Sequence, residues 1–199
     1  MTRDFLLEYL GEMTLYKSKY RIESIRLKGW NYLSNGYYFT NICTKNREYL
    51  FGKIENGVML LSDIGKMAEK YWQEIPNHFP FVELDEFIVM PNHIHGIVII
   101  EKNDGNDCRD VACNVSTRVI DKKMSSISPK TNSLSTTIRS YKSAVSKSVH
   151  EFYPDFAWQS RFHDRIIRDN DELNRIRKYI VNNPHNWAKD DNYLPEVAQ

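Results

Sequence analysis

The sequence has no run of apolar residues that approaches the roughly 20 needed to cross a membrane. Its start also lacks the pattern of a secretory signal, because Asp4 falls within the first five residues. The sequence contains only three cysteines, Cys43, Cys108 and Cys113, an odd number that predicts no disulfide framework and favours a reducing compartment. Cys108 and Cys113 have no second cysteine pair with which to close a zinc site. We therefore expect a cytoplasmic protein with free thiols and no membrane partner.

An excess of charge of one sign is also missing. The chain has 27 Lys and Arg residues against 26 Asp and Glu residues, a formal net charge of +1. A nucleic-acid role would therefore need a local basic face. Residues 1–36 offer one, an arm in which basic residues surround aromatic ones: Lys17, Lys19, Arg21, Arg26 and Lys28 around Tyr16, Tyr20 and Trp30. Such an arm suits a phosphate backbone with bases to stack on, but taken alone a solvated loop is the better interpretation.

Residues 37–188 are expected to form a single domain of helices and antiparallel strands. Composition and hydrophobic spacing predict strands at 37–44, at 47–54 as its possible hairpin partner, at 58–61, at 81–101 with a turn near Pro91, and at 156–167. Helices are expected after Ser62, after Ser133 or Ser135, and from the capping box at Asp169 to Asn182 or Asn183, before Pro184. This order predicts an α+β fold with helices against one sheet.

Two segments of the chain are predicted to lack regular structure. Residues 102–133 are polar and aperiodic, which predicts a mobile loop inside the domain. Residues 189–199 are expected to form a frayed tail.

A pair of histidines stands out in the predicted strand that follows Pro91. Residues two apart on a strand point to the same face, so His93 and His95 present two imidazoles side by side, with Ile94 turned into the core. A neutral imidazole is the commonest metal ligand in proteins, and two of them make half a metal site. The alternative is a pair of histidines on a solvated strand face, and the His-x-His pattern alone does not decide between the two.

The last predicted helix carries a second pair of polar residues. Tyr179 and Asn183 are four residues apart and therefore share one helix face, beside an apolar stripe that includes Ile176 and Ile180. A phenol is a possible nucleophile, and an amide oxygen is a fair ligand for a hard cation. Taken alone, a tyrosine at the core edge and an asparagine that caps the helix is the better interpretation.

Together with the histidines, these residues form a wider pattern. It consists of Tyr-Phe-Thr and Ile-Cys-Thr at 38–44, Met-Pro-Asn-His-Ile-His at 90–95, Trp-Gln-Ser-Arg-Phe-His-Asp-Arg at 158–165 and Arg-Lys-Tyr-Ile-Val-Asn-Asn-Pro at 177–184. The sequence resembles the single-tyrosine HUH transposases of the insertion-sequence 200 type, and it is most similar to their relatives, the REP-associated tyrosine transposases. The matching pieces occur in the family's order and span most of residues 20–187.

The resemblance implies a ferredoxin-like antiparallel sheet with helices packed on it, the HUH endonuclease core. It implies that His93, His95 and Asn183 bind a divalent metal, Mg2+ or Mn2+, and that Tyr179 is the nucleophile. The expected activity is a transposase that nicks and rejoins single-stranded or hairpin DNA through a 5′-phosphotyrosine. Dimeric members supply the tyrosine to a partner's histidines, so a homodimer is one possible assembly. The loop at 102–133 is longer than expected for a minimal member.

Basic residues near the tyrosine are the candidates for phosphate contacts, with a solvated charged face as the equal alternative. They are Arg161, Arg165, Arg168, Arg175 and Lys178. Two other functions stay open. One is a catalytically silent, domesticated protein that binds hairpin DNA, although a pure binder has no need for both histidines with Tyr179 and Asn183. The other is a two-histidine hydrolase of small phosphoesters, which would form no covalent adduct with DNA.

Overall fold

The structure is a computed structural model that describes residues 15–16, 20–21, 30–102 and 131–194. The chain divides into two units, Met1–Trp30 and Asn31–Gln199. In the first unit, β1 (Leu15–Tyr16) pairs antiparallel with β2 (Tyr20–Arg21). Most of the predicted basic arm, residues 103–130 of the predicted mobile loop and residues 195–199 of the predicted tail lie outside the described residues. All residues of the expected site belong to the second unit.

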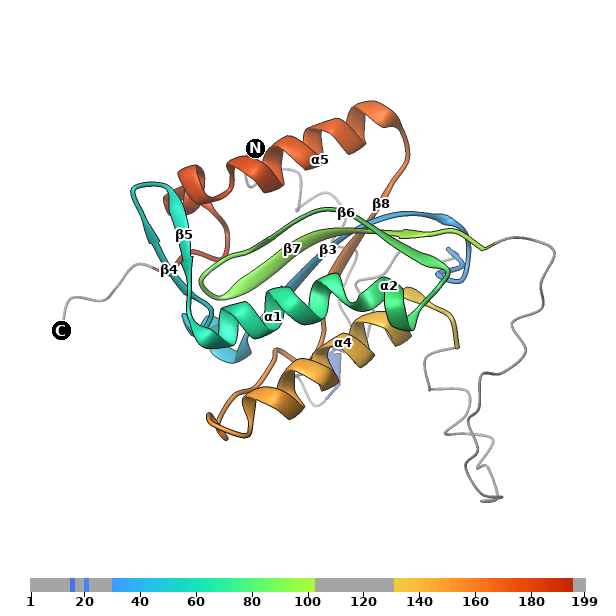
Figure 1. Cartoon of the computed structure of the whole chain (residues 1–199). Helices are drawn as coiled ribbons and strands as arrows, with labels where there is room; N and C mark the ends of the chain where they lie inside the picture. The colour runs from blue at the N-terminus through green and yellow to red at the C-terminus, as the bar shows by residue number, and fades with distance from the viewer. Residues whose placement is uncertain (1–14, 17–19, 22–29, 103–130, 195–199) are drawn as a thin grey trace, which may run out of the picture. The chain divides into compact units, whose positions relative to one another are not determined.

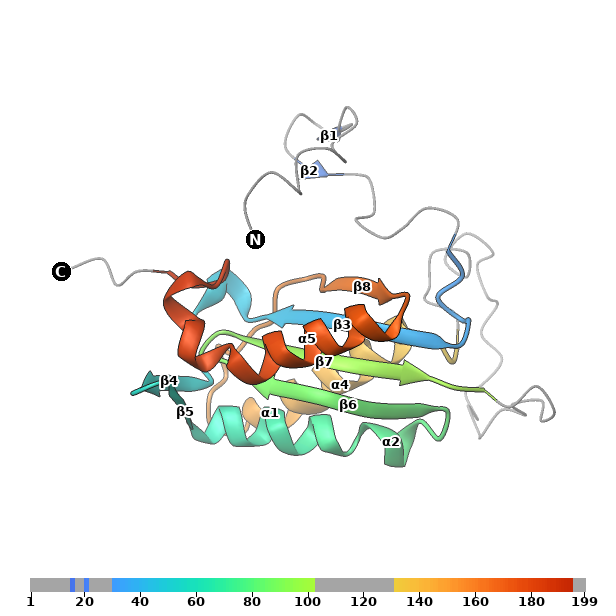
Figure 2. The same cartoon turned by 90° about the horizontal axis from the view of Figure 1, so that it is seen from above.

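A four-stranded antiparallel sheet forms the centre of the second unit, in the order β6-β7-β3-β8 (Figures 1 and 2). Its strands are β6 (Val82–Val89), β7 (His93–Ile100), β3 (Gly36–Cys43) and β8 (His163–Ile167). The register of β3 against β7 sets Cys43 opposite His93 and Asn41 opposite His95. The two strands predicted on either side of Pro91 are therefore β6 and β7, and the second of them lies in the interior of the sheet.

Helices cover both faces of this sheet. Figure 1 shows α1 (Asp63–Gln73), α2 (Ile75–His78) and α4 (Leu134–Val149) on one side, and α5 (Asn170–Asn182) on the other. A hairpin of β4 (Gly52–Glu55) and β5 (Val58–Leu61) and two short 3-10 helices, η2 (Lys45–Arg47) and η3 (Pro184–Lys189), complete the described elements. The α+β prediction is confirmed. Among the described helices, none combines the length and apolar character that a membrane crossing requires.

The alternation of side chains along β7 explains why both faces are apolar in the middle of the sheet. Ile94 and Val98 join the larger core with α1 and α4, whereas Ile97 joins a smaller core with Leu173 and Ile180 of α5. At Gly96 a Cβ would lie 2.3 Å from the Trp72 ring, so glycine is required for this tryptophan of α1 to approach the strand so closely.

The predicted helix starts are confirmed in their capping bonds. The Ser62 hydroxyl accepts from the Gly65 amide at 3.1 Å, and Ser133 caps α4 through the Thr136 amide. At α5, Asp169 accepts from the Glu172 amide at 2.7 Å. Glu172 in turn accepts from the Arg168 amide, one residue before the usual partner in a capping box.

Two strand predictions need correction. Residues 47–54 do not pair with β3, because β3 lies between β7 and β8 and β4 pairs with β5 instead. The predicted strand at 156–167 is regular only from His163, and Trp158 forms an isolated bridge with Thr44. The alternating aromatic residues before His163 reflect core packing rather than a ladder: Trp158 packs on Phe156 and donates to the Lys142 carbonyl at 3.1 Å.

Candidate metal and tyrosine site

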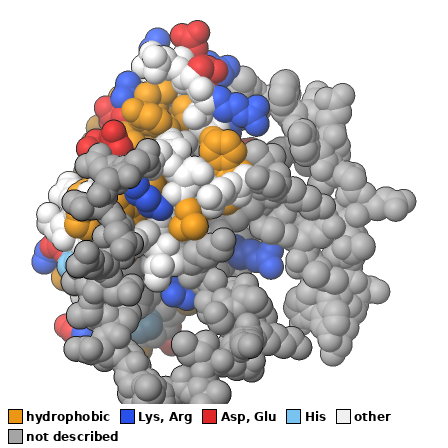
Figure 3. Space-filling view, turned by 90° about the vertical axis from the view of Figure 1, so that its right-hand side faces the viewer, with side chains coloured by type: hydrophobic (Ala, Val, Ile, Leu, Met, Phe, Trp, Pro, Cys, Tyr) orange, Lys and Arg blue, Asp and Glu red, His pale blue; other side chains and the backbone are white. Residues whose placement is uncertain are grey.

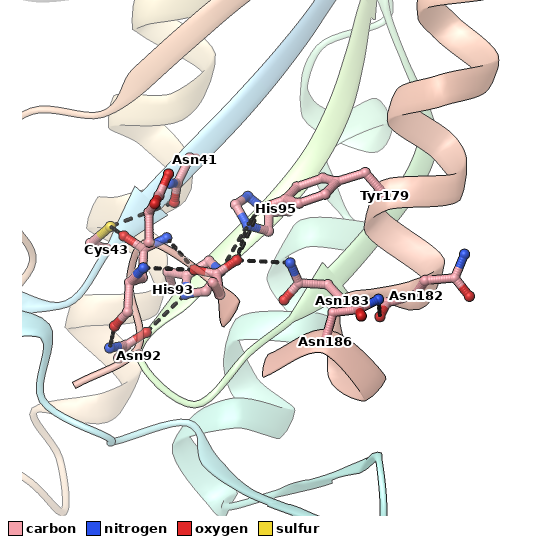
Figure 4. A network of polar contacts seen from close by, with 12 residues as sticks. Asn41, Cys43, Asn92, His93, His95, Tyr179, Asn182, Asn183 and Asn186 are labelled. Carbon is pink, nitrogen blue, oxygen red and sulfur yellow. Dashed lines mark hydrogen bonds and ion pairs between the residues drawn. The ribbon is translucent and has the colours of Figure 1, made fainter. Parts of the chain in front are cut away.

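The two histidines of β7 are buried and face each other. His93 is 0% and His95 2% exposed, so they do not lie on a solvated strand face. Their Nε2 atoms are 2.8 Å apart (Figure 4). At this separation the two nitrogens share at most one hydrogen, which leaves at least one lone pair directed into the space between them.

Asn92 sets the orientation of His93. Its Oδ1 lies 2.8 Å from His93 Nδ1, while its Nδ2 donates to the carbonyls of Arg47 at 3.1 Å and Asn192 at 2.8 Å. Because the amide nitrogen is occupied by two carbonyls, the oxygen must face His93. His93 Nδ1 therefore carries the hydrogen and its Nε2 is left with a lone pair, as in a metal-ligating histidine.

Tyr179 reaches this site from α5 in the same chain. Its Oη is 3.1 Å from His95 Nε2 and donates to Asp190 Oδ2 at 2.9 Å. Phe39 of β3 stacks on the His95 ring with centroids 5.2 Å apart and meets the edge of the Tyr179 ring. The tyrosine is 45% exposed overall, but its hydroxyl points inward toward the histidines (Figure 4).

A charged contact fixes α5 on the sheet one turn before its C-terminal end. Arg177 makes a two-pronged contact with Asp85 through its Nε and Nη2 atoms. Asp85 lies at the irregularity between Leu84 and Phe87, where the pairing of β6 with β7 shifts. The Asp85 carboxylate thus joins β6 to the helix that carries the tyrosine.

Asp190 is a site residue that the sequence interpretation missed. Its side chain is 1% exposed. Its Oδ2 lies 3.6 Å from His95 Nε2, and its Oδ1 accepts from the backbone and side-chain nitrogens of Asn192 at 2.7 and 3.0 Å. His93, His95 and Asp190 each offer a ligand atom within 4.8 Å of the others, so this group could hold a metal ion. The polar run that contains Asp190 follows the last helix and looked like part of the frayed tail.

Asn183, the expected third ligand, lies beside Asp190. It is 2% exposed and caps the C-terminal end of α5. Its Nδ2 donates to Asp190 Oδ2 at 2.8 Å, whereas its Oδ1 is buried and has no hydrogen-bond partner among the residues that the structure describes. The amide nitrogen, not the amide oxygen, is thus the atom that contacts the carboxylate (Figure 4).

The electrostatics of the site favour the protonation states that a metal site needs. Burial lowers the pKa of both His93 and His95, which keeps the imidazoles neutral. Burial opposes ionisation of Asp190, but contacts with His95, His93 and Asn183 outweigh it and hold the pKa of this carboxyl well below its usual range. Burial and the Asp190 charge raise the pKa of the Tyr179 phenol well above its usual value.

Of the predicted DNA-binding residues, Arg165 lies on β8, Arg175 and Lys178 lie on α5, and Arg161 and Arg168 lie in the segments on either side of β8. Arg161, Arg168, Arg175 and Lys178 are exposed, and Arg165 forms an ion pair with the buried Glu172 at 2.6 Å. On the side of the molecule shown in Figure 3, Lys and Arg side chains are interspersed with acidic and apolar ones. Arg175 lies four residues before Tyr179 on α5, so the two side chains share one face of the helix.

An open pocket of about 680 Å³ adjoins the site. Its lining combines cationic, amide, hydroxyl and aromatic groups: Thr44, Lys45, Asn46, Arg47, Trp158, Gln159, Ser160 and Leu194. Arg47 connects it to the site, because its Nη1 donates to the carbonyl of Asp191 at 2.7 Å.

Comparisons with known proteins give one sequence relative and a shared fold. No family model matches the chain. An uncharacterized protein of Haemophilus influenzae is 39% identical over 175 residues, which cover 86% of this chain and 92% of the relative. Among solved structures, a REP-associated tyrosine transposase bound to a REP hairpin is similar, with a TM-score of 0.53 and 18% identity over 83% of this chain and 77% of the other.

Proposed function

The chain belongs to the same family as the uncharacterized Haemophilus influenzae protein, and we propose that it is a transposase that nicks and rejoins single-stranded hairpin DNA. The observation that carries the proposal is the meeting of a tyrosine hydroxyl with two buried histidines: Tyr179 Oη lies 3.1 Å from His95 Nε2, which lies 2.8 Å from His93 Nε2. The fold shared with a REP-associated tyrosine transposase supports it. Because that structure contains a REP hairpin, hairpin DNA is the proposed partner of this chain too.

The residues fit a divalent metal, Mg2+ or Mn2+. Two neutral imidazoles and a carboxylate converge in a buried space, and Asn92 holds His93 in the ligating tautomer. When bound, the cation would polarise a non-bridging oxygen of the scissile phosphate and offset the charge that develops there. His93 and His95 are proposed as two of its ligands, with the third supplied from the chain segment that faces them.

Tyr179 is proposed as the nucleophile. Its Oη forms a bond to phosphorus, the bond from phosphorus to the 3′-oxygen breaks, and the leaving oxygen takes up a proton. The phenolic proton is released to solvent. The product is a 5′-phosphotyrosine, and a second 3′-hydroxyl can displace the tyrosine because the phosphodiester energy is retained. Phe39 packs against the Tyr179 ring and Arg177 fixes the helix that carries it, so only the tyrosine side chain has to turn to meet the phosphate, which reduces the cost of positioning it.

The pocket beside the site gives the DNA strand a place to lie. Its volume of about 680 Å³ falls within the range of 300–1,000 Å³ that is usual for ligand sites. Lys45 and Arg47 can neutralise phosphates, while Gln159 offers an amide to a base edge. Exposed Arg168, Arg175 and Lys178 are proposed as further phosphate contacts, and Arg161 and Arg165 remain candidates on the β8 side.

The deciding experiment is incubation of the full chain with hairpin DNA labelled at its 3′ end and Mn2+, followed by denaturing electrophoresis in SDS, because the fragment joined to the tyrosine keeps the 3′ end. A transposase gives a labelled, SDS-stable protein band that disappears on protease treatment. A silent hairpin-binding protein retards the DNA in a native gel but gives no such band. A hydrolase cleaves a small phosphodiester without ever becoming labelled. Either of these two results would refute the proposed activity.

A further inference from the structure

We propose that Asp190 is the third metal ligand, through Oδ2, and that Asn183 is a residue that positions this carboxylate. The inference rests on the proposed function only in taking the site to hold a divalent metal. It concerns a residue from the segment after η3, eleven positions beyond Tyr179 in the chain.

The separations of the three ligand atoms suit one small cation. Two ligands at right angles around an ion, each about 2.1 Å from it, are about 3.0 Å apart, and a tetrahedral angle widens this to about 3.4 Å. His93 Nε2 and His95 Nε2 are 2.8 Å apart, and His95 Nε2 and Asp190 Oδ2 are 3.6 Å apart. These two distances bracket the expected values, and all three ligand atoms lie within 4.8 Å of one another, so they converge on a space of the size that one ion needs.

The Asp190 carboxylate is held with the correct oxygen toward the histidines. Asn192 occupies Oδ1 with two hydrogen bonds at 2.7 and 3.0 Å. Asn192 is itself buried, and its carbonyl accepts from Asn92, the residue that orients His93. Two of the three ligands are therefore set by one hydrogen-bonded unit, in which Asn92 and Asn192 face His93 and Asp190 respectively. Ligands of metal sites are commonly fixed by such supporting hydrogen bonds.

Asn183 is oriented as a donor to this carboxylate. Its Nδ2 contacts Asp190 Oδ2 at 2.8 Å. Reversing the amide would bring its oxygen against the same carboxylate oxygen, and two acceptors at that distance repel each other. An anion also offsets part of the cation's charge in a buried site, which a neutral amide does not.

The test is Mn2+ binding by the full chain without DNA, measured by titration calorimetry. Asp190→Asn keeps the shape of the side chain, and Asp191→Asn is the matched control at the exposed neighbour. Asp190→Asn is expected to weaken Mn2+ binding at least tenfold, Asp191→Asn to leave it unchanged, and Asn183→Ala to weaken it less than Asp190→Asn does. An Asn183→Ala effect equal to or larger than that of Asp190→Asn would overturn the assignment, as would unchanged binding in Asp190→Asn or no binding by the unmodified chain.

A ligand exchange covers the case in which Asp190→Asn does not fold. Asp190→Cys should bind Cd2+ and develop an ultraviolet sulfur-to-cadmium charge-transfer band, because thiolates are strong ligands of soft cations. Asp191→Cys is the control, since it carries the same number of thiols and should show no band above that of the unmodified chain. Equal bands in both variants would refute the ligand role. Because neither measurement involves DNA, a protein that binds Mn2+ through Asp190 but never forms an adduct would refute the proposed function alone.

Discussion

Removal of a single oxygen atom from Tyr179 should abolish the covalent DNA adduct without unfolding the protein. In Tyr179→Phe the hydrogen bond to Asp190 and the contact with His95 are lost. Asp190 Oδ2 keeps its bond from Asn183, so no buried carboxylate oxygen is left without a partner. The expected cost is therefore about 1 kcal/mol of unfolding free energy, the usual net value of one hydrogen bond.

Tyr141→Phe is the matched control because it deletes the same atom elsewhere. Tyr141 is 3% exposed, donates to the Ala68 carbonyl at 3.0 Å and packs edge-on against Trp72. Its loss should also cost about 1 kcal/mol. Burial raises the pKa of this phenol well above its usual value, and its hydroxyl donates to a backbone carbonyl of α1 rather than to a proposed metal ligand. The two variants thus match in stability and differ only in the predicted chemistry.

The assay compares both variants with the unmodified chain on labelled hairpin DNA in Mn2+, with chemical denaturation to verify the stability match. Tyr179→Phe should give no SDS-stable adduct and retain hairpin binding in a native gel, whereas Tyr141→Phe should retain both. Adduct formation by Tyr179→Phe, or mapping of the DNA to a peptide that contains residue 141, would refute the assignment of the nucleophile.

Three further predictions follow from the site and its surroundings. His93→Ala should abolish cleavage and weaken Mn2+ binding while the circular dichroism spectrum stays native. Cleavage by a chain in which both His93 and His95 are replaced by alanine, in the presence of a chelator, would contradict the metal role. Arg175→Ala should reduce the magnitude of the negative slope of log affinity for hairpin DNA against log salt by about one, whereas Lys66→Ala on α1, where the lysine pairs with Asp63, should leave the slope unchanged. Equal slopes in both variants would exclude Arg175 from the interface. Burial raises the pKa of the Cys43 thiol to about 11, so at pH 8 only about one thiol in a thousand is ionised. Alkylation of this cysteine, followed by peptide mass mapping, should therefore be far slower in the native chain than in the denatured chain. Rapid labelling of the native chain would show that Cys43 is accessible.

The parts of the site that sequence could predict are those set by local periodicity. His93 and His95 share a face because strand residues two apart always do, and Tyr179 and Asn183 share one because helix residues four apart do. The same holds for the capping residues at the starts of α1, α4 and α5, whose bonds span only three residues. The α+β fold followed from the order of these local patterns.

What sequence could not predict depends on contacts between distant segments. Asp190 acquires its position from Asn192, which in turn meets Asn92 across 100 residues. The strand neighbours of β3 are likewise set by long-range pairing, so the nearby residues 47–54 were a plausible but wrong partner. The aromatic alternation before His163 looked like a strand because packing against α4 and a β-ladder both produce large side chains at every second position.

The positions of the site residues imply that Tyr179 must move during the proposed reaction. Its Oη is 3.1 Å from His95 Nε2 and 2.9 Å from Asp190 Oδ2, so the hydroxyl occupies the space between two proposed ligands of the cation. A phosphate that binds the cation and is attacked in line needs about 3 Å on the side of the nucleophile, and this space is now taken by the nucleophile itself. The helix axis is fixed by Arg177 and the buried Ile180, whereas the Tyr179 ring is 45% exposed. Rotation of the side chain on a fixed α5 is therefore the movement that admits the strand, and it would break the bond to Asp190 at the same step in which that carboxylate becomes a ligand.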